Sequence, residues 1–267
     1  MLISAYLVPH SPVLIPSIGK ENRKIIKETV SAYEEIAEKI KKDKIDTLFI
    51  ISPHGQNGQD FFCLNAPEKY LIDFKNFGDL GTKKEIKTNS SLAFRLKNSI
   101  SDKKKIRIIA QQNLDYSSGI PLFLISQINP KIQALVLSRS ELNLFDHFSF
   151  GTEIQNILSS NPKRIAIVAS GDLSHRLKRT SQAGYSIKGA KFDNRIIEIL
   201  NKGSEDWKQI LEIDGKLIQE AQECGLKSLA VLLGAIKSLP FSGKFLSYEK
   251  DLGIGYLCFE FSLLSPA

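Results

Sequence analysis

The sequence has few cysteines and no long apolar run. Its three cysteines, Cys63, Cys224 and Cys258, are scattered over 267 residues and form no CxxC pair. Isolated cysteines in odd number argue against a disulfide framework and give no sign of a thiolate zinc site, so we expect reduced thiols. The longest apolar runs, such as 229–236, are well short of the ~20 residues that span a bilayer. We therefore expect no transmembrane helix.

The first 16 residues are apolar, but they lack both the basic start and the small-residue cleavage site of a secretory signal. We accordingly expect a cytoplasmic protein. The formal charge is +7, yet the lysines are spread along the chain. The densest run, Lys103-Lys104-Lys105, has no interleaved aromatic side chains of the kind that single-strand binders use. This pattern indicates a solvated surface, so we expect no nucleic-acid partner.

Short apolar runs alternate with segments of helical periodicity, and 42% of the residues are hydrophobic. In Glu21–Lys42 the apolar residues recur at spacings that place them on one helix face. The predicted strands are Leu2–Val8, Thr47–Ser52, Ile106–Ala110, Ala134–Ser138, Arg164–Ser170 and Ile254–Phe261. The other predicted helices are Ser90–Ile100, Pro121–Gln127, Phe148–Leu158, Phe192–Asn201, Trp207–Glu223 and Ser228–Ser238. This alternation predicts a three-layer α/β/α fold with a largely parallel or mixed central sheet.

No linker, repeat or low-complexity tract divides the chain, so we expect one domain over residues 1–267. The longest stretch without clear periodicity is Gln56–Thr88. A loop of this length in a compact domain is usually functional or disordered, so the segment is either a hairpin insertion or a loop over a site.

Three of the four histidines follow an apolar strand candidate. His10 and His54 each end a strand in a Pro-His pair, and His175 follows the strand that ends at Ser170. Ligands of open α/β sheets bind outside the carboxyl ends of the strands, so these side chains should converge. Each histidine alone could equally be a structural residue bonded to backbone, whereas three together indicate a site. The fourth, His147, lacks this placement and is interpreted as structural.

Two imidazoles and one carboxylate form the ligand set of open Fe(II) sites and of several catalytic zinc sites. His10 and His54 are therefore candidate metal ligands. In the polar turn that ends at His175, Asp172 could orient the imidazole, an arrangement that suits an acid/base residue. A serine nucleophile in this turn is a weaker alternative, since no GxSxG elbow surrounds it.

Five short motifs span nearly the whole chain: Val8-Pro-His10-Ser-Pro12, Ser52-Pro-His54-Gly55, Ser170-Gly-Asp-Leu-Ser-His175-Arg-Leu177, Glu223-Cys-Gly225 and Ser247-Tyr-Glu249…Gly253-Ile-Gly255-Tyr256. Together, and in this order, they resemble the class III extradiol ring-cleavage dioxygenases, the LigB-like family. Within that family they are most similar to the branch associated with the AmmeMemoRadiSam system, and the Memo proteins are relatives.

The resemblance implies a non-haem Fe(II), with Zn(II) as the alternative, bound by His10, His54 and Glu249. It also implies that His175 is the acid/base histidine, with Asp172 beside it. Where the family usually carries a pocket histidine this chain has Tyr116. A phenol with a pKa near 10 can donate a hydrogen bond but seldom carries protons at neutral pH.

Three functions follow as expectations. The first is an Fe(II)-dependent extradiol dioxygenase that cleaves a catechol-like aromatic ring with O2. The second is a Memo-like metal-binding redox or partner protein with little turnover, and the third is a zinc-dependent hydrolase that uses the same residues. In many relatives of this family the LigB-like domain is fused to an AMMECR1 domain, whereas this chain stops after its last strand. The resemblance therefore implies that the partner, an AMMECR1-type or radical SAM protein, is a separate polypeptide. We also expect a homo-oligomer, since C2 dimers are the commonest assemblies.

Overall fold

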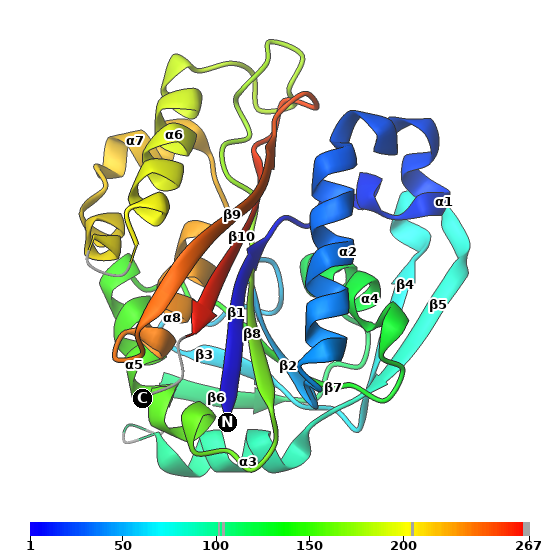
Figure 1. Ribbon diagram of the computed structural model, residues 1–267, viewed down its shortest axis with the longest axis vertical. Helices are drawn as coiled ribbons and strands as arrows, with labels where there is room; N and C mark the ends of the chain where they lie inside the picture. The colour runs from blue at the N-terminus through cyan, green and yellow to red at the C-terminus, as the bar shows by residue number, and fades with distance from the viewer. Residues whose placement is uncertain (101, 103–104, 204–205, 264–267) are drawn as a thin grey trace.

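The computed structural model describes residues 1–100, 102, 105–203 and 206–263, and it contains a mixed eight-stranded sheet with helices on both faces (Figure 1). The strand order is β6-β3-β7-β2-β8-β1-β10-β9. The strands are β1 (Leu2–Val8), β2 (Thr47–Ser52), β3 (Phe62–Asn65), β6 (Ile106–Ile109), β7 (Gln133–Ser138), β8 (Ile165–Ser170), β9 (Phe241–Glu249) and β10 (Tyr256–Leu263). The predicted three-layer α/β/α fold is thus confirmed.

The centre of the sheet is parallel and fully buried. Strands β7, β2, β8 and β1 run in the same direction, whereas β10 is antiparallel to β1, and β9 is antiparallel to β10. Successive residues of β2 alternate between the two sides of the sheet: Leu48 and Ile50 pack in one apolar cluster, and Phe49 and Ile51 in the other. Burial on both faces explains why these strands read as continuous apolar runs.

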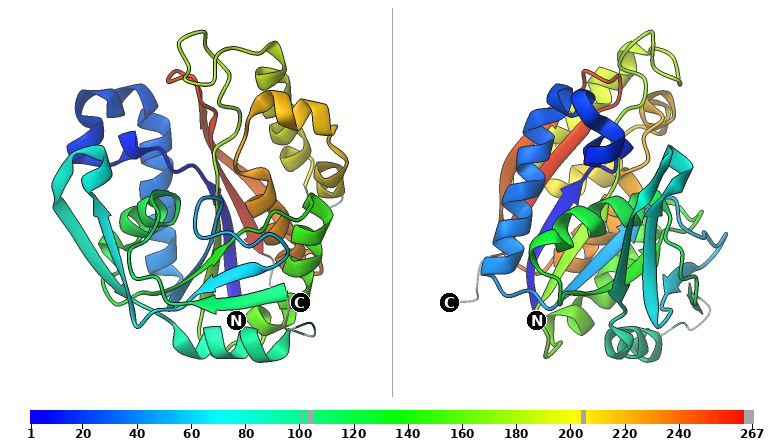
Figure 2. Two further views of the ribbon diagram at one scale, coloured as in Figure 1. Left: turned by 180° about the vertical axis from the view of Figure 1, so that it is seen from behind. Right: turned by 90° about the vertical axis from the view of Figure 1, so that its right-hand side faces the viewer.

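Each face of the sheet has its own cover (Figure 2). On one side lie α2 (Lys27–Lys42), α4 (Tyr116–Ile125) and a two-stranded hairpin of β4 (Lys69–Phe74) and β5 (Asp79–Lys87). On the other side lie α3 (Ser90–Ser99), α5 (Leu144–Ser159), α6 (Ile187–Asn201) and α8 (Leu226–Ile236), with α7 (Gly215–Ala221) beside α6. None of the described helices is both long and apolar enough to cross a bilayer.

Two helix predictions need correction. The periodic segment predicted over 21–42 begins as a 3₁₀ helix, η2 (Lys20–Ile26), and becomes an α-helix only at Lys27. The segment predicted as one helix over 207–223 is divided into η6 (Trp207–Glu212) and α7, because Ile213 is extended and Asp214 caps the next helix by accepting from the amide of Lys216.

Other regions contain elements for which no helix or strand was predicted, and one of these elements is the short helix α1 (Pro16–Gly19). The segment 56–88 contains β3 and the β4–β5 hairpin, which agrees with the hairpin alternative. Strand β9 was not predicted, because it lies at the sheet edge and four successive residues from Ser242 are exposed. In the lysine run, Lys103 and Lys104 lie outside the described residues.

Candidate metal centre

The structure brings His10 and His54 together at the carboxyl edge of the sheet. They follow β1 and β2, which lie on either side of β8. Their ring centroids are 5.1 Å apart, and the ring planes are nearly perpendicular at 83°. His10 is almost completely buried, whereas His54 is exposed. Desolvation by the surrounding protein atoms lowers the pKa of His54 to about 4, and the neighbouring His10 adds to this effect. His54 is therefore a neutral imidazole at physiological pH.

The tautomer of His10 is set by a chain of hydrogen bonds. Its Nδ1 lies 3.0 Å from the hydroxyl of Ser170, and this hydroxyl donates its single proton to the carbonyl of Ser117 at 2.6 Å. The hydroxyl must therefore accept from Nδ1–H, which leaves the lone pair on Nε2. Burial lowers the pKa of His10, so the ring is neutral. His10 thus presents Nε2 as a free ligand atom.

Cys224 faces this free nitrogen. Its Sγ lies 3.6 Å from Nε2 of His10 and accepts a hydrogen bond from the amide of Asp172 at 3.3 Å. The ligand atoms of His10, His54 and Cys224 all lie within 4.8 Å of one another. Desolvation raises the pKa of the Cys224 thiol well above its usual value. The sequence interpretation missed this residue because an isolated cysteine predicts no metal site; its only signal was its place in the Glu223-Cys-Gly225 motif.

The loop after β8 and the loop before α8 meet with backbone against backbone. A Cβ atom on Gly171 would lie 2.1 Å from Cα of Gly225, so position 171 needs glycine. The amides of Cys224 and Gly225 both donate to the carbonyl of Asp172, at 3.2 and 3.1 Å. This contact fixes Cys224 next to Asp172.

Asp172 lies between two imidazoles. Its Oδ1 accepts from the amide of His10 at 3.0 Å, and its Oδ2 is 3.7 Å from Nε2 of His10 and 4.0 Å from Nε2 of His175. The ligand atoms of Asp172, His175 and Cys224 also lie within 4.8 Å of one another, so the two candidate sets share the cysteine. His175 opens onto a cavity of about 550 Å³, whose walls include Ser181, Gln222, Leu252 and Ile254.

Tyr116 is the third ring of this cluster. Its ring stacks on His54 with centroids 5.4 Å apart and an angle of 21°, and it meets the edge of His10 at the same distance. The residue opens α4, whose N-terminus is capped by the Asp115 carboxylate through the amide of Ser118 at 3.0 Å. Burial raises the pKa of Tyr116 to about 12, so its phenol is neutral.

Glu249 is not placed with the two histidines. Its carboxylate accepts from the amides of Glu28 and Thr29 and from the hydroxyl of Thr29, at the first turn of α2. Among the described residues, Cys224 is the residue whose ligand atom lies within 4.8 Å of the ligand atoms of both His10 and His54. The expected set of His10, His54 and Glu249 is therefore not the set that the structure assembles.

Comparison with known proteins identifies the family of this chain. Residues 4–257 match the family described as the catalytic LigB subunit of aromatic ring-opening dioxygenase. The chain belongs to the LigB family. Protein CA_C1420 of Clostridium acetobutylicum is 29% identical over 261 residues, covering 94% of this chain and 55% of its own length, so the LigB-family chain spans about half of that relative.

A solved structure shares the same architecture. The crystal structure of the uncharacterized protein JW3007 from Escherichia coli superposes with a TM-score of 0.68 and covers 97% of this LigB-family chain and 99% of its own. The two sequences are 14% identical, so this similarity concerns the fold alone.

The side chains at the centre of this LigB-family chain fit a divalent transition metal. Two neutral imidazoles and one sulfur are donors that zinc, iron and copper accept, and the Asp172 carboxylate adjoins them. His10 also shows the outer hydrogen bond that orients metal-binding histidines, from Nδ1 to Ser170. The residues thus fit a metal, although the donor set contains sulfur where the Fe(II) facial triad has a carboxylate.

Proposed function

We propose that the chain is a metal-dependent oxidoreductase of the extradiol dioxygenase type, which opens a catechol-like aromatic ring with O2. The proposal assigns Fe(II) to His10, His54 and Cys224, with Glu249 outside the ligand set. The observation that carries it is the free Nε2 of a neutral His10, which faces both His54 and Cys224. A bound iron would supply open positions at which a catecholate and dioxygen meet.

Side chains of this protein would accept and return the protons of the substrate. His175 adjoins the 550 Å³ cavity and would accept a substrate hydroxyl proton at Nε2. The Asp172 carboxylate, 4.0 Å from that nitrogen, would stabilise the resulting imidazolium. Tyr116 would not exchange protons, because its pKa of about 12 keeps the phenol neutral. Its ring would instead hold His54 in place.

The test begins with protein purified without oxygen and reloaded with Fe(II). We expect one iron per chain and catechol-dependent oxygen uptake with a yellow ring-opened product. Cys224→Ala should lose iron, whereas His175→Ala should keep iron and lose oxygen uptake. Glu249→Ala is the matched control, and it should keep iron. Full iron occupancy in Cys224→Ala would contradict the ligand assignment. Turnover of an ester or amide by the zinc-loaded protein under anaerobic conditions would instead support the hydrolase.

The sulfur ligand favours a second candidate, a Memo-like metal-binding redox protein with little turnover. A thiolate donor suits softer metals than the facial triad does, and Tyr116 replaces the histidine of the ring-cleaving relatives. Such a protein would act with an AMMECR1-type or radical SAM protein. Bound metal that changes its oxidation state reversibly, with no oxygen uptake across a catechol panel, would support this candidate over the dioxygenase.

A further inference from the structure

A second cavity lies between α2, α4 and the segment that precedes α2. Its volume is about 740 Å³. The walls are mostly apolar and include Leu14, Ile15, Val30, Tyr33, Phe123 and Leu124. Ligand pockets in proteins have this size and this composition, with a few polar groups that orient the ligand. None of the candidate metal ligands lines this cavity.

One cation, Arg23, lines the same cavity. Its Nε is buried and has no hydrogen-bond partner. Within the part of the chain that the structure describes, no carboxylate lies within ion-pair distance of this guanidinium. Arg23 therefore brings an unpaired positive charge to a mostly apolar wall, where its guanidinium can meet an anionic group of a ligand.

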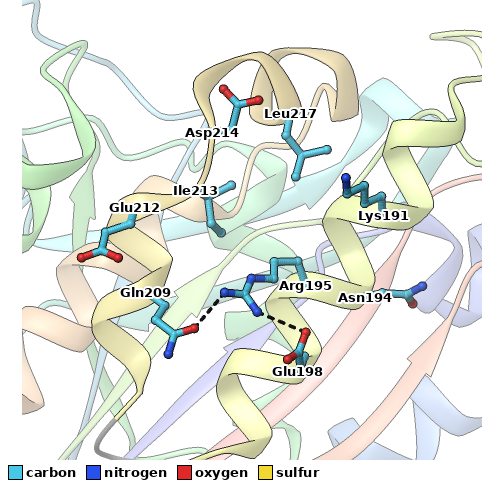
Figure 3. A pocket seen from close by; sticks show the side chains of 9 residues that line it. All are labelled: Lys191, Asn194, Arg195, Glu198, Gln209, Glu212, Ile213, Asp214 and Leu217. Carbon is cyan, nitrogen blue, oxygen red and sulfur yellow. Dashed lines mark hydrogen bonds and ion pairs between the residues drawn. The ribbon is translucent and has the colours of Figure 1, made fainter.

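The polar cavity drawn in Figure 3 provides a contrast. It lies between α6, η6 and α7, and Arg195 projects into it. This guanidinium already donates to Glu198 at 3.2 Å and to Gln209 at 2.8 Å. The guanidinium of Arg195 is paired, whereas that of Arg23 has no carboxylate partner among the described residues.

We propose that the apolar cavity binds a monocarboxylic acid with a medium-length alkyl chain. The carboxylate would accept from Arg23, and the chain would lie along α2 against Val30 and Ala37. Two carboxylates, Glu34 and Glu38, also line the cavity, from positions on α2. These carboxylates would repel a second acid group, so the site selects a monoacid over a diacid.

The test uses decanoate as the probe, with metal-free protein and isothermal titration. The proposal is independent of the metal centre, so its outcome does not depend on the proposed function. We expect saturable binding of one decanoate per chain. Decanol, which lacks the charge, and decanedioate, which meets Glu34 and Glu38, should each bind at least about tenfold more weakly. These comparisons use the wild-type protein, so they do not depend on whether a variant folds.

Variants then locate the site. Arg23→Gln should weaken decanoate binding by about tenfold without changing the affinity for decanol. Lys24→Gln is the matched control, because Lys24 is the exposed neighbour and does not line the cavity. Val30→Phe should narrow the cavity beside the alkyl chain and weaken the binding of both decanoate and decanol. The proposal is overturned by absent or non-saturable decanoate binding, by equal affinity for decanoate and decanol, or by unchanged binding in a folded Arg23→Gln protein.

Discussion

The carboxylate of Glu249 accepts two hydrogen bonds from Thr29, one from the amide at 2.8 Å and one from the hydroxyl at 2.6 Å. Thr29 lies in the first turn of α2, and Glu249 is the last residue of β9. The amides of a helix's first turn have no partners within the helix, and the helix dipole favours a negative charge there. Glu249 thus joins the sheet edge to the start of α2.

Replacing this carboxylate should affect stability more than metal binding. We expect Glu249→Ala to lower the free energy of unfolding by about 1–2 kcal/mol, as the loss of a helix cap does. Urea unfolding and metal content measure the two effects separately. Glu21→Ala serves as a control, because Glu21 is exposed and pairs with Lys24 at the surface. If Glu249→Ala loses its metal while the free energy of unfolding is unchanged, Glu249 is a metal ligand.

The hydroxyl of Ser170 should influence metal affinity through His10. Ser170→Ala removes the acceptor of Nδ1–H, so the ring is no longer held with Nε2 free. Loss of such an outer partner typically weakens metal binding by about 10–100-fold. Competition with a chelator measures this change. Ser228→Ala is the control, since its buried hydroxyl has no hydrogen-bond partner; equal affinities in the two variants would show that Ser170 has no such role.

Gly171 should tolerate no side chain. In Gly171→Ala the new Cβ would collide with the Gly225 backbone, whereas Gly215→Ala places its Cβ in open space. We expect a loss of about 1–3 kcal/mol or more in the first variant, the usual cost of overpacking. The control should remain close to the wild type. Thermal unfolding of both proteins checks this prediction, and equal stability would contradict the observed contact.

His147 should make folding stability sensitive to acid. Its Nδ1 lies 2.8 Å from the carbonyl of Asn143 and its Nε2 accepts from the amide of Ser140, so the folded protein holds the neutral ring. Burial lowers its pKa to about 4. The unfolded chain, with a pKa near 6.5, binds a proton first. The contribution of His147 to the free energy of unfolding is therefore complete above pH 6.5 and is lost as the pH falls toward 4.

The pKa of His147 is about 4 in the folded protein and near 6.5 in the unfolded chain. This difference corresponds to about 3 kcal/mol in the free energy of unfolding. Urea unfolding between pH 4 and 7 measures the loss. His147→Gln removes one titrating group, so its stability should fall less steeply with acid than that of the wild type. Parallel curves for the two proteins would show that the ring is not held neutral. His10 and His54, whose pKa values are also lowered, add to the same trend in both proteins.

The central strands could be predicted because burial on both faces leaves continuous apolar runs, as in β1 and β2. The same strands place His10 and His54, since a strand end determines where the next side chain lies. Cys224 could not be found this way, because its position depends on a contact between two loops that are distant in the sequence. The hydrogen bonds of Glu249 to Thr29 could not be predicted for a related reason: only the tertiary structure shows that β9 ends beside α2.

The 3.6 Å approach of Cys224 to His10 joins residues 214 positions apart in the chain. An unfolded chain rarely closes a loop of this length, because the closure costs conformational entropy that only the contacts of the folded structure repay. The ligand set is therefore a property of the native state alone. An ion that binds there recognises the folded protein and shifts the unfolding equilibrium by mass action. Metal supply would then regulate not only the chemistry of this protein but also how much of it stays folded.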